Sequence, residues 1–336
     1  MPEAVATAAS ADPQTLRLLE RAAGLEKHPL ARLISLVEQE HDAGRARRAA
    51  LFRHLRADAV AYPLRARVIG FTGTPGAGKS TLIGRLALEL LESGPAVRVA
   101  VLAIDPSSVE SGGALLGDRL RTHFPVGEPR IFFRSQATQG DLGGVGRRTF
   151  AVSRLLRHVF DFVFVETVGI GQSEIEITQL ADATALVLQP LAGDHVQFMK
   201  AGVMEVPDLF VVNKCDEERL ARRSVYELET ALQSVRVGTR RDGVPLRVFR
   251  TSALRGTGIA ELAAFLAEHV PVPEFATLRR RERHFLAKAI AERYGRFGVA
   301  QLDRTIAELP PAVAESAVYE DLEDAALAAI RSRIHD

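Results

Sequence analysis

The chain has 336 residues, of which 47% are hydrophobic and 25% are charged, values that are ordinary for a soluble globular protein. Its 43 basic and 42 acidic residues give a formal net charge of +1, so no overall field draws the chain to nucleic acid or to an anionic membrane surface. No apolar run approaches the roughly 20 residues needed to span a bilayer, and the single cysteine, Cys215, excludes a disulfide framework and a multi-cysteine zinc site. We therefore expect no membrane partner and no nucleic-acid partner.

Residues 1–62 predict a leader followed by a helical extension. The first residues lack the basic start and the long apolar core of a signal peptide, and they lack the Arg-rich bias of a transit peptide, so we expect a cytoplasmic protein. From Pro13 to about Tyr62, apolar residues recur at helical intervals.

Residues 63–272 change to short β-branched runs separated by helical stretches. The expected strands are RVIGFTG, VRVAVLAID, RIFFRSQ, DFVFVETVG, ATALVLQP, DLFVVNK and LRVFRTS. Several of them are apolar on successive residues, as in strands that are buried on both faces of a parallel sheet. The pattern predicts an α/β fold with a mostly parallel, doubly wound sheet.

Residues 273–336 predict a C-terminal helical arm. The segments RRRERHFLAKAIAERYGRF and VYEDLEDAALAAIRSRI have helical periodicity and no strand pattern. A charge run that begins a helix is usually a solvated face, and we interpret Arg279–Arg281 in this way rather than as an anion site.

The segment GTPGAGKS, residues 73–80, matches the phosphate-binding pattern G-x-x-x-x-G-K-[ST]. It follows the expected strand RVIGF directly and opens the helix TLIGRLALELL, as the motif requires. Small residues let successive backbone N–H groups surround phosphates, and the helix N-terminus adds a partial positive charge. We expect Lys79 to reach the β- and γ-phosphates and the Ser80 hydroxyl to bind Mg²⁺. The chain is thus predicted to be a P-loop NTPase.

Three acidic residues are candidate partners of this metal. Asp105 ends the strand VRVAVLAID, at the edge where open parallel sheets bind ligands. Asp118 follows a Gly-Gly pair, and Glu166 closes an apolar run in the Walker-B form, which delivers a carboxylate to Mg²⁺ or its waters. For Asp105 and Asp118 the alternative is an ordinary turn or capping residue. The predicted metal site consists of Ser80, Asp105, Asp118 and Glu166.

Residues 213–216, NKCD, follow the strand DLFVV at the position of the guanine-reading NKxD motif. The Asp216 carboxylate can accept from the N1–H and the exocyclic amine of guanine, whereas adenine offers neither donor there. Asn213 and Lys214 are expected to hold the loop and cover the base. Residues 252–254 fit the second base-contacting loop, where a backbone N–H meets guanine O6. The predicted nucleotide-binding residues are Gly73, Thr74, Pro75, Gly76, Ala77, Gly78, Lys79, Ser80, Thr81, Asn213, Lys214, Asp216, Ser252, Ala253 and Leu254.

Residues 166–169, ETVG, resemble the D-x-x-G switch motif with Glu in place of Asp. Gly169 is expected to donate its N–H to the γ-phosphate and to reorient after hydrolysis. Many regulatory GTPases place a water-orienting glutamine next, but here Ile170 follows and cannot do so. Gln172 is either a substitute or a surface residue of no consequence.

Seven segments, in order and spacing, resemble the MeaB/ArgK/MMAA family of G-protein chaperones for adenosylcobalamin-dependent acyl-CoA mutases. They are RVIGFTGTPGAGKSTL, LAIDPSS, SGGALLGDR, TQGDLGGVGRRT, FVETVGIGQSE, LQPLAGDHVQFMKAG and VVNKCD. The resemblance runs from about residue 29 to residue 271. It implies that GTP and GDP bind with Mg²⁺ and that turnover gates cofactor loading, protection or reactivation of a mutase of the methylmalonyl-CoA type. It also implies a homodimer through the C-terminal arm and a third switch loop from Gln189 to Lys200.

Hydrolysis is expected to be slow in the isolated chain, because neither Ile170 nor an evident arginine finger completes the site. A bound mutase could order the missing groups, for which Asp105, Arg119, Gln172 and Lys200 are the candidates. The predicted catalytic residues are Lys79, Asp105, Glu166, Gly169 and Lys200.

Three other functions stay open at this point. A small-molecule kinase would need an acceptor pocket, which the sequence does not reveal. A metal-insertion GTPase for hydrogenase or urease commonly carries Cys/His clusters, which a single cysteine argues against. The non-enzymatic alternative is a GTP-binding module with negligible turnover.

Overall fold

The computed structural model describes residues 11–105, 127–137, 145–167, 173–190, 207–234 and 246–335. The chain divides into two compact units. The helical unit consists of Met1–Leu64, Phe150–Val159 and Pro273–Asp336, and the sheet unit consists of Arg65–Thr149 and Phe160–Val272. The N-terminal and C-terminal helical regions therefore belong to one unit, together with a short segment from the middle of the chain. The boundaries expected near residues 62 and 272 stay a prediction.

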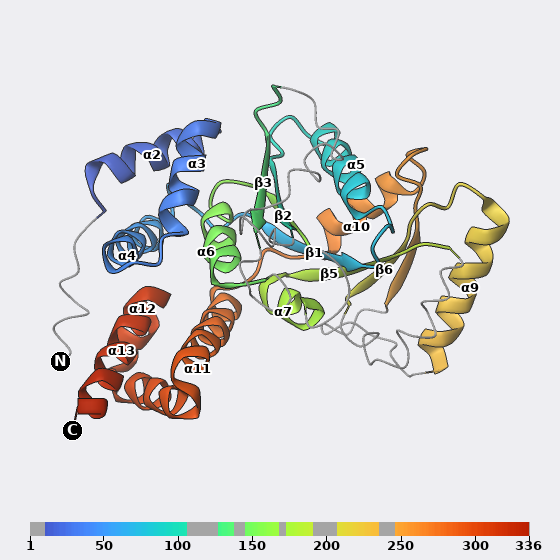
Figure 1. Ribbon diagram of the computed structural model, residues 1–336. Helices are drawn as coiled ribbons and strands as arrows, with labels where there is room; N and C mark the ends of the chain where they lie inside the picture. The colour runs from blue at the N-terminus through green and yellow to red at the C-terminus, as the bar shows by residue number, and fades with distance from the viewer. Residues whose placement is uncertain are drawn as a thin grey trace, which may run out of the picture. The chain divides into compact units, whose positions relative to one another are not determined.

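The sheet unit is built on a seven-stranded sheet in the order β3-β2-β4-β1-β5-β6-β7 (Figure 1). The strands are β1 (Arg67–Gly73), β2 (Val99–Asp105), β3 (Ile131–Ala137), β4 (Phe162–Glu166), β5 (Ala183–Leu188), β6 (Leu209–Val212) and β7 (Arg247–Arg250). All six pairings between them are parallel, which confirms the predicted α/β fold with a doubly wound sheet. The strand order reverses beside β1, and in such sheets the crevice at this point is where ligands bind.

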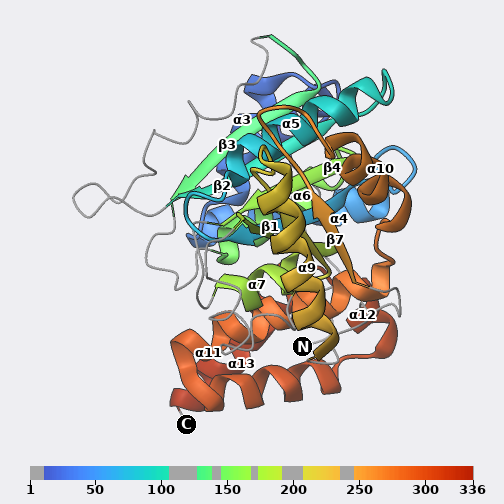
Figure 2. The ribbon, with the colours of Figure 1, turned by 90° about the vertical axis from the view of Figure 1, so that its right-hand side faces the viewer.

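Helices cover both faces of the sheet (Figures 1 and 2). The helices of this unit are α5 (Lys79–Glu92), α7 (Ser173–Leu180), α9 (Glu218–Ser234) and α10 (Ile259–His269). On one face, Ile69 and Phe71 of β1 share a buried cluster with apolar residues of α5 and α10. On the other face, the backbone of Gly70 lies close to Ile177 of α7, and α9 packs Leu228 against β5 and β6. Since strands alternate side chains between faces, a sheet covered twice needs apolar residues at successive positions, as these strands have.

Three aspartates fix the register at the N-terminal edge of the sheet. Each one directly precedes a strand and accepts a backbone N–H from the start of a neighbouring strand, or from the residue before it. The three bonds run from Arg98 to Asp161, from Val68 to Asp182 and from Thr184 to Asp208, at 2.9, 2.6 and 2.8 Å. These carboxylates therefore serve the fold, and the opposite, C-terminal edge of the sheet carries the motifs.

The helical unit contains α2 (Pro13–Ala23), α3 (Lys27–Val37), α4 (Asp42–Ala57), α11 (Phe275–Glu308), α12 (Pro311–Ser316) and α13 (Tyr319–His335), and α6 (Arg147–Leu156) from Phe150 onward. Helix α2 begins at a side-chain cap, since Asp12 accepts the Thr15 N–H at 2.9 Å and Pro13 occupies the first turn. Helix α11 is kinked at Gly295, whose φ of 58° is left-handed. None of the described helices combines the length and the apolar character that crossing a membrane would require.

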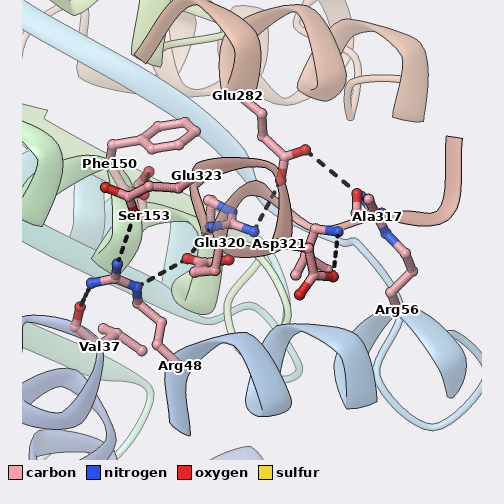
Figure 3. A network of polar contacts seen from close by, with 12 residues as sticks. Val37, Arg48, Arg56, Phe150, Ser153, Glu282, Ala317, Glu320, Asp321 and Glu323 are labelled. Carbon is pink, nitrogen blue, oxygen red and sulfur yellow. Dashed lines mark hydrogen bonds and ion pairs between the residues drawn. The ribbon is translucent and has the colours of Figure 1, made fainter. Parts of the chain in front are cut away.

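A network of buried charges joins α4, α6, α11 and α13 of the helical unit (Figure 3). Arg154 lies 2.9 Å from Glu320 and 3.0 Å from Glu282, and its guanidinium group covers the Phe52 ring at 3.8 Å. Arg48 donates to Glu320 at 3.0 Å, and Glu320 is only 1% exposed. Burial opposes ionisation of Glu320, but the charges of Arg154 and Arg48 outweigh it and lower its pKa below the ordinary value. Glu320 is therefore held in its charged form by two arginines of the same unit.

One sequence interpretation is wrong in this unit. Arg279 was expected on a solvated helix face, but its guanidinium group donates to the main-chain carbonyls of Ala314 and Ala317. It thereby satisfies carbonyl groups around the end of α12, while its neighbour Arg280 is exposed. A charge run in sequence does not reveal which of its members will meet a helix terminus.

Candidate nucleotide-binding site

The loop between β1 and α5 requires glycine at two positions. Gly73 has a φ of 139°, and a Cβ there would lie 2.0 Å from the Val187 carbonyl oxygen of β5. Gly78 has a φ of 84° and caps α5, and a Cβ there would lie 2.7 Å from Asn213 Nδ2. Neither position tolerates another residue without strain or displacement. The loop is thus held tightly against β5 and against the NKCD segment.

The Lys79 ammonium group points back into this loop. It donates to the carbonyl oxygens of Gly73 at 3.0 Å and Thr74 at 3.1 Å, and the residue is only 7% exposed. Burial of a lysine is costly unless the charge is satisfied. The two carbonyl contacts satisfy the ammonium group and hold a positive charge within a loop of the phosphate-binding type.

The Ser80 hydroxyl donates to Glu166 Oε1 at 2.7 Å. Glu166 ends β4, pairs in register with Phe71 of β1 and Ala103 of β2, and is buried. The first turn of α5 therefore contacts the acid of the expected Walker-B strand, although the two residues lie far apart in sequence. Asp105 ends β2, two residues beyond Ala103, so its backbone reaches the same edge of the sheet.

A hydroxyl oxygen and a buried carboxylate in direct contact form a donor set that suits Mg²⁺, a hard cation that binds oxygen and keeps several waters. Ser80 and Glu166 therefore fit the predicted metal site. Four other residues that the sequence analysis named, Gly169, Gln172, Asp118 and Lys200, lie outside the described residues, as does Arg119.

Asn213 connects three loops. Its Nδ2 donates to the Ala77 carbonyl oxygen at 2.9 Å, and its Oδ1 accepts from Thr251 Oγ1 and from the Ala253 N–H, each at 3.2 Å. The residue is 1% exposed, so these bonds are made away from water. One side chain thereby fixes the phosphate-binding loop, the NKCD segment and the loop at 252–254 relative to one another.

Asp216 is held by the loop that follows β7. Its Oδ1 accepts from the Ser252 hydroxyl at 2.7 Å and lies 3.5 Å from Arg255 Nε. The Ser252 oxygen in turn accepts the Arg255 backbone N–H at 3.0 Å. The contacts with Ser252 and Arg255 therefore hold the carboxylate in one orientation, as the recognition of a base requires.

Lys214, beside it, is exposed, adopts a φ of 61° and donates through Nζ to Gln189 Oε1 at 3.2 Å. Its long side chain lies next to the Gly78 position, where its Cε would be 3.7 Å from an added Cβ. Cys215 packs at the end of β6, and burial raises the pKa of its thiol. Nothing in this arrangement gives Cys215 a chemical role.

The remaining predicted residues of the same loops differ in exposure. Ala77 and Ala253 are buried, whereas Pro75, Gly76 and Thr81 are exposed. Leu254 is 76% exposed, which is high for a leucine beside so much buried structure. The described part of the predicted nucleotide-binding set is thus brought together at one edge of the sheet, and its binding role stays a prediction.

Sequence reasoning missed three residues at this edge. Thr251 supports Asn213, Arg255 lies against Asp216, and Arg85 of α5 donates to the carbonyl oxygens of Ala253 and Leu254. Thr251 stands next to a recognised loop, so its position was a usable signal. Arg85 gave none, since an arginine on a helix surface reads as a solvated side chain.

The family model described as "Methylmalonyl Co-A mutase-associated GTPase MeaB" matches residues 30–294 of the chain. A putative GTPase of Pyrococcus abyssi is 42% identical over 255 residues, which are 75% of each protein. The mitochondrial "methylmalonic aciduria type A homolog" of Caenorhabditis elegans is 34% identical over 287 residues, covering 82% of this chain and 71% of that protein. Among solved structures, that of a LAO/AO transport system kinase matches with a TM-score of 0.60 at 25% identity, covering 98% of this chain and 100% of the other.

Proposed function

Because the chain belongs to the MeaB family of methylmalonyl-CoA mutase-associated GTPases, we propose that it is a Mg²⁺-dependent GTPase that serves as the chaperone of an adenosylcobalamin-dependent acyl-CoA mutase. The observation that carries the proposal is the convergence of three loops on Asn213. A phosphate loop and an oriented carboxylate at Asp216, fixed together in this way, form a site for a guanine nucleotide rather than for a phosphate alone.

The residues of the site have separable tasks. Lys79 neutralises the β- and γ-phosphates as negative charge develops on them, and Asp216 accepts the guanine N1–H and exocyclic amine. Ser80 and Glu166 would hold Mg²⁺, with Asp105 and Asp118 as the further acids of the proposed metal site. When bound, the metal ion supplies charge neutralisation at the phosphates.

Turnover in this proposal is slow in the isolated chain and is activated by the mutase. In this proposal, described residues make the phosphate, metal and base contacts, whereas the groups that respond to hydrolysis, Gly169 and Lys200, belong to the E-x-x-G segment and to the loop from Gln189. Binding of a mutase would order these groups, and GTP turnover would gate loading, protection or reactivation of the cobalamin cofactor. The printed family description and the name of the nematode relative support the mutase as partner.

The proposal also covers the assembly. We infer a cytoplasmic homodimer in which the helices after residue 272 pair with those of a second copy. Light scattering on the purified chain tests this part separately, and a monomer at micromolar concentration would contradict it.

Two measurements test the nucleotide specificity. Calorimetry with Mg²⁺ should give tight binding of GTP and GDP and at least about a hundredfold weaker binding of ATP, because adenine would cover the half-exposed Asp216 carboxylate without offering it a donor. The Asp216→Asn variant should have a severely reduced affinity for GDP. It should bind xanthosine diphosphate better than GDP, since xanthine carries a carbonyl where guanine carries its amine. Equal affinity for ATP and GTP would contradict the guanine assignment.

A third measurement tests the partner. Single-turnover GTP hydrolysis should rise about tenfold to 10³-fold when a purified B12-dependent mutase saturates the protein, by analogy with groups supplied in trans to GTPases. The phosphoryl group should be recovered as inorganic phosphate, since phosphorylation of an added small molecule would favour a kinase instead. Unchanged rates with a mutase proven to bind would exclude activation, and full stimulation of Lys200→Ala would exclude that residue from it.

A further inference from the structure

We propose that Arg85 is a positioning residue for guanine recognition, and that it turns the Leu254 N–H toward O6 of the base. This inference rests on the proposed guanine-nucleotide site and adds to it a residue that lies on α5, outside all of the nucleotide motifs. The hydrogen bonds around the loop at 252–255 support it.

Arg85 grips this loop by its carbonyl groups. Its Nε donates to the Ala253 oxygen at 3.0 Å, and its Nη2 donates to the Leu254 oxygen at 3.3 Å. The planar guanidinium fork thus holds two consecutive peptide groups from the side of α5. Because α5 begins at the phosphate-binding loop, Arg85 ties the base loop to the same helix that carries Lys79 and Ser80.

Holding a carbonyl oxygen also orients the next N–H. In a planar trans peptide, the C=O of one residue and the N–H of the following residue point in opposite directions. With the Ala253 oxygen turned toward Arg85, the Leu254 N–H must point away from α5. With the Leu254 oxygen held as well, the Arg255 N–H is turned to the Ser252 hydroxyl, which it meets at 3.0 Å.

The donors of this loop can now be assigned one by one. The Ala253 N–H is taken by Asn213 Oδ1, and the Arg255 N–H is taken by Ser252. Within the described part of the chain, the Leu254 N–H meets no acceptor, and Leu254 is 76% exposed. A base whose N1–H binds Asp216 presents its O6 next to that edge. Leu254 is therefore the donor that fits O6, and Arg85 fixes its direction.

The test compares GDP with two analogues, using calorimetry on the full chain with Mg²⁺. Inosine diphosphate keeps O6 and N1–H but lacks the 2-amino group, whereas 6-thioguanosine diphosphate replaces O6 with a poor acceptor. Arg85→Ala should weaken GDP and inosine diphosphate alike, by about fivefold to tenfold, the size of one hydrogen bond. It should leave the affinity for the 6-thio analogue nearly unchanged. Arg85→Lys should recover part of the loss, because an ammonium group can bind one of the two carbonyls.

Arg223→Ala is the matched control, since it removes one arginine from an exposed ion pair on α9 of the same unit. It should leave all three affinities unchanged. Any loss seen only in Arg85→Ala then comes from the orientation of the loop and not from the loss of a positive charge. Equal losses of Arg85→Ala for all three ligands would mean general loosening of the loop and would overturn the inference. A smaller loss for inosine diphosphate than for GDP would assign the effect to Asp216 and would overturn it too. If the wild-type chain bound no GDP, the proposed function itself would fail. If the wild type bound GDP and Arg85→Ala left all affinities unchanged, only the role of Arg85 would fail.

Discussion

The sheet unit and the helical unit both bury polar side chains, but they do so for different ends. In the sheet unit, Lys79 and Asn213 donate to backbone carbonyls of the phosphate-binding loop, and Glu166 accepts from the Ser80 hydroxyl, all at the C-terminal edge of the strands. In the helical unit, Arg154 and Glu320 come from helices that are distant in sequence, and they satisfy each other. Buried polar side chains that bond to loops at a sheet edge position a binding site. Buried charged side chains that pair with one another fix how the helices pack. Substitutions should therefore cost activity in one unit and stability in the other.

The largest effect is expected for Arg154→Met, which leaves Glu320 and Glu282 buried without their shared cation. Removing one partner of a buried ion pair typically costs about 3–5 kcal/mol of unfolding free energy. Denaturant titration of the full chain measures it. Arg21→Ala, which removes an exposed ion pair in the same unit, should cause no measurable change.

The double variant Arg154→Met with Glu320→Gln sharpens this result. Because the two residues are in contact, the losses of unfolding free energy of the two single variants should add up to clearly more than the loss of the double variant. Additive losses would mean that Arg154 stabilises the unit through Glu282 or through its stacking on Phe52 and not through Glu320. Nucleotide affinity at a temperature where the variants stay folded should not change, and a large loss would contradict the division between the two units.

The converse effect is expected in the sheet unit. Lys79→Ala should lower single-turnover GTP hydrolysis by about 10²–10³-fold, as removal of one group that stabilises transition-state charge does elsewhere. Its unfolding free energy should stay near that of the wild type, because the substitution also removes a buried charge that is costly to hold. Hydrolysis at the wild-type rate would exclude Lys79 from the reaction, while a collapse in stability would make it a structural residue.

The same contrast explains what the sequence predicted. GTPGAGKS and NKCD are each contiguous, and their chemistry demands particular residues at fixed spacing after a strand, so the positions of both loops were foreseeable. The sheet followed from strands that are apolar on successive residues. Each of these predictions rests on local pattern, and the parallel topology brings the pieces to one edge without further information.

Contacts that depend on tertiary approach were not foreseeable. Arg85 reaches a loop that lies far along the chain, and Arg154 pairs with a residue of the last helix. In sequence, both appear as arginines of amphipathic helices, which usually face water. Arg279 misled the interpretation for the same reason. Long basic side chains are the residues whose contacts are hardest to predict, because a partner from another element decides them.

The smallest expected effect is a pH dependence of the unfolding free energy that comes from His158 in the helical unit. Burial lowers the pKa of His158 to about 4, and the positive charges of Arg154 and Arg157 act in the same direction. Its Nδ1 lies 2.8 Å from the Tyr62 carbonyl oxygen, a contact that the neutral ring makes by donating the Nδ1 proton. In the unfolded chain the ring has its ordinary pKa of about 6.5. The unfolded state therefore binds a proton that the folded state does not between about pH 6.5 and about pH 4, and stability falls as the pH falls through this window.

The expected size of this loss is about 2 kcal/mol between pH 7.5 and pH 5. His158→Asn keeps an N–H that can donate to Tyr62 and has no titrating group, so its unfolding free energy should decline less over this range, by that amount. Carboxylates such as Asp321, whose pKa burial raises, titrate in both proteins and cancel in the difference. His28→Asn, on the exposed surface of α3, is the control and should follow the wild type. Parallel pH curves for wild type and His158→Asn would mean that the folded chain protonates His158 freely. The surroundings of His158 would then be open to solvent, and the contrast with the sheet unit would rest on the buried ion pairs alone.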